Sequence, residues 1–240
     1  MSGHSKWAQI KRQKGVNDQK RGQTFTKLSI AITLSVKQGG AVIDPNQNFR
    51  LRLAIDSARA ANMPKENIER AIKRASGSEA GDLSEVIYEG FTPGGASIMI
   101  EAATDNTMRT TSEIKSIFNK GGGSFGQPGS VAYQFKKVGK IVVSKEGKTF
   151  DEIFALAVED GAEDIEEIGD EVNIYTTVEN LTKVKNNLEA SGLKIVDAHL
   201  FRQAVTPLDL ADEQKLHQIS DFVNSLESLE DVQKVYTNLL

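Results

Sequence analysis

Apolar residues in the first third of the chain recur with the spacing of an α-helix. Between residues 25 and 38, Phe25, Leu28, Ile32 and Val36 fall on one stripe, which predicts an amphipathic helix. The same spacing predicts further helices over residues 44–61 and 63–76. Three short helices with one apolar face each predict a small helical bundle.

Residues that favour helix ends mark the expected boundaries of these helices. Thr24 and Asn62 are expected to cap the first and third helices, and Asp44 to begin the second. Gly39 and Gly77 are expected to end the first and third helices, because glycine accommodates the left-handed conformation that often follows a helix.

After Gly81 the apolar residues alternate with a period of two, which is typical of β-strands. The runs VIYEGFT and ASIMIEAATD flank the turn at residues 93–95 and predict a hairpin. A helix is expected over residues 107–120, where three glycines follow it, and residues 130–135 alternate as a further strand.

Residues 138–203 predict the order strand, helix, strand, strand, helix, strand, which is the ferredoxin-like order. A helix over residues 211–226 and a short strand over 232–236 follow. A lone terminal strand needs a sheet to join, and the open sheet of residues 85–135 is the natural host.

These elements predict an α+β fold. It consists of an N-terminal three-helix bundle with a basic arm, followed by two mixed α/β domains of ferredoxin-like character, one inserted into the other. The expected domains are residues 1–80, residues 81–137 together with 204–240, and the inserted residues 138–203.

The composition is that of a globular protein, with 39% hydrophobic and 26% charged residues in 240. No apolar run approaches the roughly 20 residues that span a bilayer, and no signal-peptide pattern opens the chain. The absence of cysteine excludes disulfides and cysteine-based metal sites. We therefore expect a cytoplasmic protein without a membrane partner.

Charge is divided unevenly along the chain, whose formal net charge is -4. Residues 1–80 hold 15 basic and 6 acidic residues, whereas residues 81–240 hold 14 and 27. Lys and Arg neutralise phosphates, so the basic arm predicts contact with nucleic acid. The alternative is a solvated helix face. The candidate nucleic-acid-binding residues are Lys6, Trp7, Lys11, Arg12, Lys14, Lys20, Arg21 and Lys27.

Further cations of the bundle either extend this basic surface or pair with nearby acids, and the sequence leaves both possibilities open. These cations are Arg50, Arg52, Arg59, Arg70, Lys73 and Arg74. The acids available to them are Asp56, Glu66 and Glu69. Trp7 could stack on a base or pack on a sugar.

Two other segments stand out by composition. The glycine-rich run NKGGGSFGQPGS follows a helix and precedes a strand, which is the reverse of a phosphate-binding loop, so we expect a long turn. Residues 159–171 hold eight acids in thirteen positions without an EF-hand pattern. We interpret them as a solvated sheet or helix edge, which could alternatively dock a basic protein.

Catalytic chemistry has little support. The three histidines, His4, His199 and His217, form no metal-binding pair, and no nucleophile-elbow motif is present. Glu101 and Asp105 could form a carboxylate pair, but their spacing fits helix capping equally well. We expect no catalytic residue, no metal, no cofactor, no small-molecule substrate and no enzymatic activity.

Six separated motifs resemble the YebC/PmpR family and run from Gly3 to Leu239. They are GHSKWAQIK, RGQTFTKL, NMPKENIERAIKRA, YEGFTPGGASIMIEAATDN, GGSFGQPGSVAYQF and EDVQKVYTNL. The resemblance implies a helical domain and two α/β domains, without catalytic residues. It also implies that the basic N-terminal motif contacts nucleic acid through Lys6, Trp7, Lys11, Arg12, Lys20 and Arg21.

The resemblance implies a nucleic-acid-binding regulator of gene expression. Bacterial members are usually described as DNA-binding transcriptional regulators, which makes DNA the first expected partner. Other members, including a mitochondrial relative, act in translation, and some are linked to ribosomes stalled on proline-rich sequences. Ribosomal or messenger RNA, and the ribosome itself, are therefore the alternative partners. A third interpretation is a protein adaptor that acts through the acidic segment.

Overall fold

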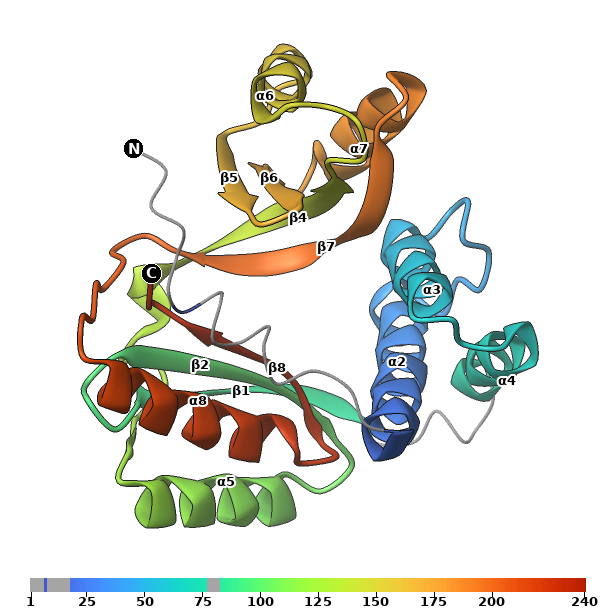
Figure 1. Ribbon diagram of the computed structural model, residues 1–240. Helices are drawn as coiled ribbons and strands as arrows, with labels where there is room; N and C mark the ends of the chain where they lie inside the picture. The colour runs from blue at the N-terminus through green and yellow to red at the C-terminus, as the bar shows by residue number, and fades with distance from the viewer. Residues whose placement is uncertain (1–6, 8–17, 77–82) are drawn as a thin grey trace.

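Three lobes make up the molecule, one of helices and two of sheets with helices packed against them (Figure 1). The structure is a computed structural model that describes residues 7, 18–76 and 83–240. The helices are α2 (Asp18–Gln38), α3 (Phe49–Ala60), α4 (Lys65–Ala75), α5 (Thr107–Gly121), α6 (Phe150–Glu159), α7 (Leu181–Ala190) and α8 (Glu213–Glu227). The strands are β1 (Ser84–Phe91), β2 (Ser97–Thr104), β3 (Ser124–Phe125), β4 (Phe135–Ser144), β5 (Asp164–Ile168), β6 (Glu171–Thr176), β7 (Lys194–Ala204) and β8 (Val232–Thr237).

Helices α2, α3 and α4 form the helical lobe around one apolar core. Ile32 and Val36 of α2, Leu51 of α3, and Ile68 of α4 are buried in it. The apolar stripe predicted for the first helix therefore faces the core. The bundle follows from amphipathic helices that bury their apolar faces against one another.

The boundaries of the bundle helices differ from the prediction. Helix α2 begins at Asp18, before the expected cap Thr24, and it continues through Gly22, where the Thr26 hydroxyl donates to the glycine carbonyl. Helix α3 begins five residues late because Asn48 caps it, accepting the Leu51 amide at 3.1 Å.

Asn62 does not cap α4 as predicted. It adopts the left-handed conformation, with φ of 57°, and Pro64 occupies the cap position. Asparagine tolerates this conformation better than most residues, and the residue before the helix needs an extended backbone that Pro64 provides.

The first sheet has the order β3-β1-β2-β8, and all its pairings are antiparallel. The terminal strand β8 pairs with β2, which confirms that it joins the sheet of the hairpin. Helices α5 and α8 cover the same face (Figure 1), where Phe118 and Phe222 meet edge to face with ring centroids 5.1 Å apart.

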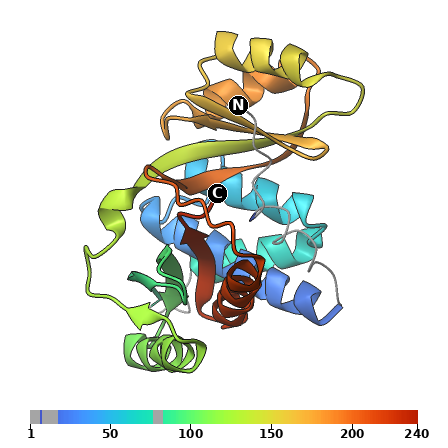
Figure 2. The ribbon, with the colours of Figure 1, turned by 60° about the vertical axis from the view of Figure 1, so that its left-hand side comes forward.

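The second sheet has the order β5-β6-β4-β7, again antiparallel, with α6 and α7 packed against it (Figure 2). This is the ferredoxin-like arrangement predicted for the segment. Its strands lie in the chain between β3 and β8 of the first sheet, and the exact boundaries of the three domains stay a prediction. The paired ends of β4 and β7 meet the first sheet through an apolar cluster that includes Met99, Phe135 and Tyr236.

The prediction of a strand over residues 130–135 is wrong. Residues Ala132–Gln134 form a 3-10 turn, and strand β4 begins only at Phe135. The backbone amides of Val131 and Ala132 donate to the carboxylate of Glu89. Because a side chain already accepts these amides, they are not available to a strand ladder.

Candidate nucleic-acid interface

Trp7 is a core residue in this structure. Its side chain is 8% exposed and lies in the apolar cluster formed by α5, α8 and the first sheet. Its backbone amide donates to the carbonyl of Leu240 at 3.3 Å. The ring is therefore covered by this apolar cluster and unavailable for stacking on a base in this conformation.

Lys27 also has a structural partner rather than an open surface. Its Nζ donates to the carbonyl of Glu227, the last residue of α8. Burial lowers the pKa of Lys27, and the nearby Glu227 carboxylate opposes part of that shift. A cation at a helix C-terminus interacts favourably with the helix dipole. The contact of Lys27 with nucleic acid stays a prediction.

The remaining predicted contacts fall on parts of the chain of which no side chain is described. Lys6, Lys11, Arg12 and Lys14 lie outside the described residues. Lys20 and Arg21 belong to the first turn of α2, but their side chains are not described. Their contact with nucleic acid stays a prediction.

Several cations of α3 already have partners. Arg59 pairs with Asp56 at 3.8 Å, and Arg50 donates to the side chain of Gln38. Arg52 donates to the carbonyls of Pro45 and Asn46 in the loop before α3. Arg50 therefore joins α3 to α2 and Arg52 fixes the loop before α3, whereas Arg59 pairs within its own helix and stays largely exposed.

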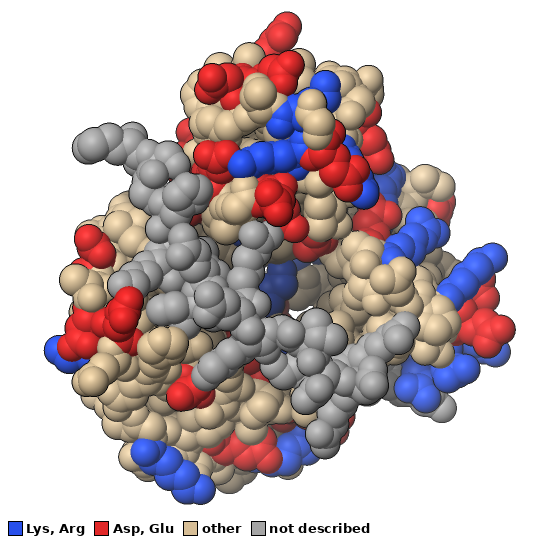
Figure 3. All heavy atoms as spheres, viewed as in Figure 1, with Lys and Arg blue, Asp and Glu red and all other residues tan. Residues whose placement is uncertain are grey.

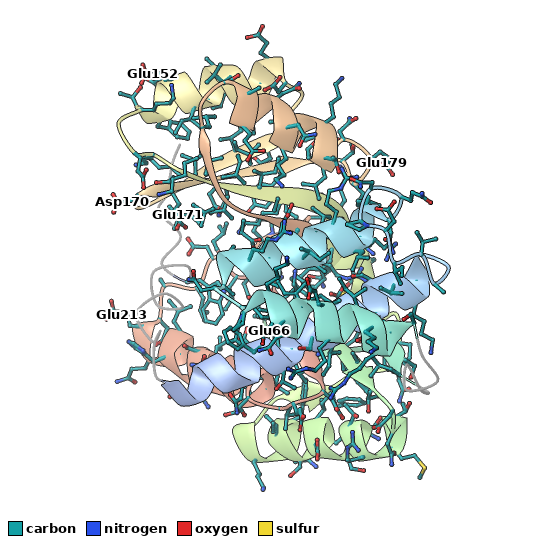
Figure 4. The ribbon with its side chains drawn as sticks, turned by 90° about the vertical axis from the view of Figure 1, so that its right-hand side faces the viewer. Glu66, Glu152, Asp170, Glu171, Glu179 and Glu213 are labelled. Carbon is teal, nitrogen blue, oxygen red and sulfur yellow. The ribbon has the colours of Figure 1, made fainter. Side chains whose placement is uncertain are left out.

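Arg70, Lys73 and Arg74 on α4 differ from these arginines, because their side chains are exposed and no carboxylate of the described residues lies within ion-pair distance. We name these three residues the α4 patch. Glu69 pairs with Lys65 at 3.6 Å, and Glu66 lies at the other end of α4 (Figure 4). Positions three and four apart share one side of a helix, so the three cations lie close together.

The α4 patch borders a cleft of about 1220 Å³ between the helical lobe and the first sheet. Arg70 and Arg74 line it from α4, and Phe25 and Ile30 line it from α2. The opposite wall consists of the beginning of α5 and the loop between α8 and β8. Sequence patterns did not reveal this cleft, since its walls come from segments far apart in the chain.

The cation on the opposite wall is neutralised. Arg109 Nη2 lies 3.0 Å from Asp105 and 2.9 Å from Asp231, and hydrogen bonds to these two acids raise its pKa. Asp231 also accepts hydrogen bonds from the hydroxyls of Thr104 and Thr110. Asp105 thus pairs with Arg109, and the possible pairing of Glu101 with Asp105 is not observed in the contacts of either side chain.

The glycine-rich loop already holds a carboxylate of this chain. Glu89 is 6% exposed, and its carboxylate accepts the amides of Gly129, Val131 and Ala132 at 2.7, 2.7 and 2.8 Å. The loop thus forms an anion-binding concavity of backbone amides, which the side chain from β1 fills.

The acidic segment lies along a sheet edge, as predicted. It includes β5, which is the edge strand of the second sheet. Glu163 pairs with Lys136 at 2.7 Å, Glu167 pairs with Lys145, and Asp164 accepts from Gln203. Figure 4 shows Asp170 projecting from the turn after β5. Two of the eight acids of this segment, Glu163 and Glu167, therefore pair with lysines, and the adaptor interpretation stays a prediction.

Two further observations concern residues 18–76 and 83–240. No helix there is both long and apolar enough to cross a bilayer. No group of three or more potential metal ligands gathers within that part of the chain.

Two family descriptions together match nearly the whole chain. The TACO1/YebC protein N-terminal domain matches residues 5–78, and the TACO1/YebC second and third domain matches residues 83–239. The fold and the basic helical lobe thus define a three-part α+β protein with one basic end. The chain belongs to the TACO1/YebC family.

Full-length relatives and a solved structure agree with this assignment. Proteins named "Probable transcriptional regulatory protein" from Roseiflexus castenholzii and Dictyoglomus thermophilum are 48% and 47% identical to this chain. They align over 100% and 99% of it and over 95% of each relative. The crystal structure of a conserved hypothetical protein, Aq1575, from Aquifex aeolicus matches with a TM-score of 0.85 and 41% identity, over 92% of this chain and 90% of that one.

Proposed function

We propose that this protein is a nucleic-acid-binding regulator of gene expression that acts on DNA in transcription. The α4 patch is the observation that carries the proposal, since its three exposed cations pair with no carboxylate of the described residues, and two of them, Arg70 and Arg74, line a large cleft. Lys73 and Arg74 also complement the dipole of α4 from its last turn, by at most about 1 kcal/mol each, whereas Arg70 lies before that turn. The names of the curated relatives support a role in transcription.

The proposed interface combines the α4 patch with the basic N-terminal arm. Lys6, Lys11, Arg12, Lys14, Lys20 and Arg21 supply the arm's positive charge. In this arrangement Trp7 anchors the arm on the first sheet, and the lysines and arginines meet phosphates. The acidic remainder of the chain, with its net charge of -13, limits indiscriminate adhesion to nucleic acid.

A second candidate is a translation factor that binds RNA on the ribosome. The concave shape of the cleft favours it, because a concave surface with cations along one wall, here Arg70 and Arg74, suits a single strand, whereas the major groove of duplex DNA admits a protruding helix. The opposite wall carries acids, which would face away from the phosphates of the strand: Asp105, Glu113, Glu230 and Asp231. Phe25, half-buried in the cleft wall, offers an aromatic ring near the α4 patch.

Binding to three targets across a salt series tests the proposal. The targets are duplex DNA, single-stranded RNA and ribosomes. The variant replaces Arg70, Lys73 and Arg74 by Gln, and a matched control replaces the exposed Lys115, Lys120 and Lys183. Loss of three phosphate contacts flattens the log-log salt slope for duplex DNA by about 2.7.

The outcomes separate the candidates. Duplex binding that weakens in the α4 variant and not in the control supports the DNA regulator. Weak duplex binding beside saturable ribosome binding that depends on α4 supports the translation factor. Equal binding of the two variants to every target would contradict both candidates. A partner protein that binds both variants equally would then favour the adaptor.

A further inference from the structure

A second cavity, of about 370 Å³, lies where the three lobes meet. Helices α2 and α3, strands β7 and β8, two residues of β2 and single residues of β1 and β4 contribute to its walls. Figure 3 shows a hollow between the lobes, with Lys or Arg atoms inside it. Its size falls in the range of small-molecule sites, which begins at about 300 Å³.

Apolar side chains make up much of this cavity. Leu28 and Leu34 come from α2, Leu53 and Ala54 from α3, and Phe201 from β7. Walls of this kind favour a ligand with an aliphatic or aromatic body, because its apolar surface leaves water on binding.

The acids that line the cavity already have partners. Glu101 accepts from Arg202 Nε at 2.7 Å and from the Tyr236 hydroxyl at 3.0 Å. Glu85 accepts from the side-chain amide of Gln38 at 2.8 Å. These acids therefore offer little to a cationic ligand.

Hydrogen-bond donors remain available in the same cavity. Lys234 Nζ donates to the carbonyl of Leu200 at 3.2 Å, and no carboxylate of the described residues lies within ion-pair distance of it. Lys137 is exposed and likewise lacks an acidic partner there. Gln233 Nε2 is buried and meets no acceptor in the described part of the chain. A buried donor without an acceptor is costly, so an incoming acceptor would stabilise it.

We propose that this cavity binds a small organic anion with an apolar body. The anionic group meets Lys234 and Lys137, the amide of Gln233 donates to it, and the apolar body packs between Leu28, Leu53 and Phe201. Such a ligand would touch all three lobes at once. Its affinity would then depend on how the lobes are placed, which is the physical requirement for an effector that adjusts the nucleic-acid-binding end.

Fluorescence titration with 8-anilinonaphthalene-1-sulfonate, a small aromatic anion, tests this site on the full chain without nucleic acid. We expect saturable binding of about one probe per chain. Lys234→Met weakens it about tenfold or more by removing the charge, and Ala54→Leu weakens it by filling the cavity. Lys183→Met, on the exposed surface of α7, is the matched control and leaves binding unchanged.

Competition identifies the chemistry of the ligand. 1-Naphthoate displaces the probe at lower concentration than 1-naphthalenemethanol, which has the same rings without the charge. Equal competition, absence of saturable binding, or equal affinity of the Lys234→Met and Lys183→Met variants would overturn the proposal. If Lys234→Met fails to fold by circular dichroism, the surface variant Lys137→Met replaces it in the same comparison.

Discussion

Ser57 of α3 donates a hydrogen bond from its Oγ to Oδ1 of Asp197 on β7, at 2.9 Å. The other carboxylate oxygen of Asp197 meets His199 Nδ1 at 2.8 Å. Because the ionised carboxylate only accepts, Nδ1 carries the proton. This contact joins the helical lobe to the second sheet through groups that titrate.

The pKa values of His199 and Asp197 predict that the folded protein loses stability at low pH. Burial lowers the pKa of His199 below 6.5, and the hydrogen bond to Asp197 reverses only part of that effect. Burial raises the pKa of Asp197, but hydrogen bonds and charge from His199 and a hydrogen bond from Ser57 outweigh it and hold the value at about 2. In both cases the unfolded chain binds protons more readily than the folded one, so stability falls as the pH decreases.

We expect the free energy of unfolding to fall from about pH 6.5 downward through His199, and again between about pH 4 and pH 2 through Asp197. Each bound proton changes the free energy of unfolding by at most about 1.4 kcal/mol per pH unit. The contribution of Asp197 is smaller, because its carboxylate is partly exposed to solvent. Urea unfolding at successive pH values measures the effect. His199→Asn should flatten the upper window, whereas His217→Asn, on an exposed site, should not. Equal slopes in all three proteins would contradict the assignment.

We expect truncation of the Glu89 side chain to lower the stability of the protein strongly. Glu89→Ala leaves three backbone amides without their acceptor, and we expect a loss of about 3 kcal/mol or more. Glu89→Gln retains one acceptor oxygen and should lose less. Denaturant unfolding followed by circular dichroism compares the two, and an Ala variant as stable as the Gln variant would contradict the described role.

Trp7 is the only tryptophan in the chain, so its fluorescence reports the docking of the N-terminal segment. Emission should be blue-shifted and weakly quenched by acrylamide in the native protein. Deletion of Leu239 and Leu240 removes a member of the same apolar cluster and the carbonyl that accepts the Trp7 amide. The emission should then shift to the red while far-ultraviolet circular dichroism stays native. Unchanged emission after deletion would show that the C-terminus does not hold Trp7.

Lys27→Met distinguishes a structural lysine from a nucleic-acid contact. Loss of the hydrogen bond to the Glu227 carbonyl should lower the free energy of unfolding by about 1 kcal/mol. The salt slope of nucleic-acid binding should not change, because the ammonium group is engaged within the protein. A flatter salt slope with unchanged stability would instead support the prediction that Lys27 contacts nucleic acid.

Local patterns account for most of the predicted elements. The apolar stripe of α2 and the strand alternation of β1 and β2 both depend on residues near one another in sequence. Several helix ends were misplaced for local reasons, such as the Asn48 cap of α3, and one strand was wrongly predicted because a distant group intervened. Residues 130–135 alternate like a strand, yet the carboxylate of Glu89, about forty positions earlier, takes their amides.

The sequence by itself determined the element order, the α+β class and the concentration of positive charge in the first 80 residues, because composition and periodicity are properties of the chain. The tertiary structure alone decided which cations are free. Arg74 and Arg109 are both helix cations, but Asp231, far along the chain, lies 2.9 Å from Arg109, whereas no carboxylate of the described residues pairs with Arg74. The tertiary structure also buries Trp7 in the core of the first sheet and places Lys27 Nζ against the carbonyl of Glu227. Whether a charged side chain is free or an aromatic ring is buried depends on its neighbours in space. Those neighbours come from distant parts of the sequence and are brought together by tertiary packing.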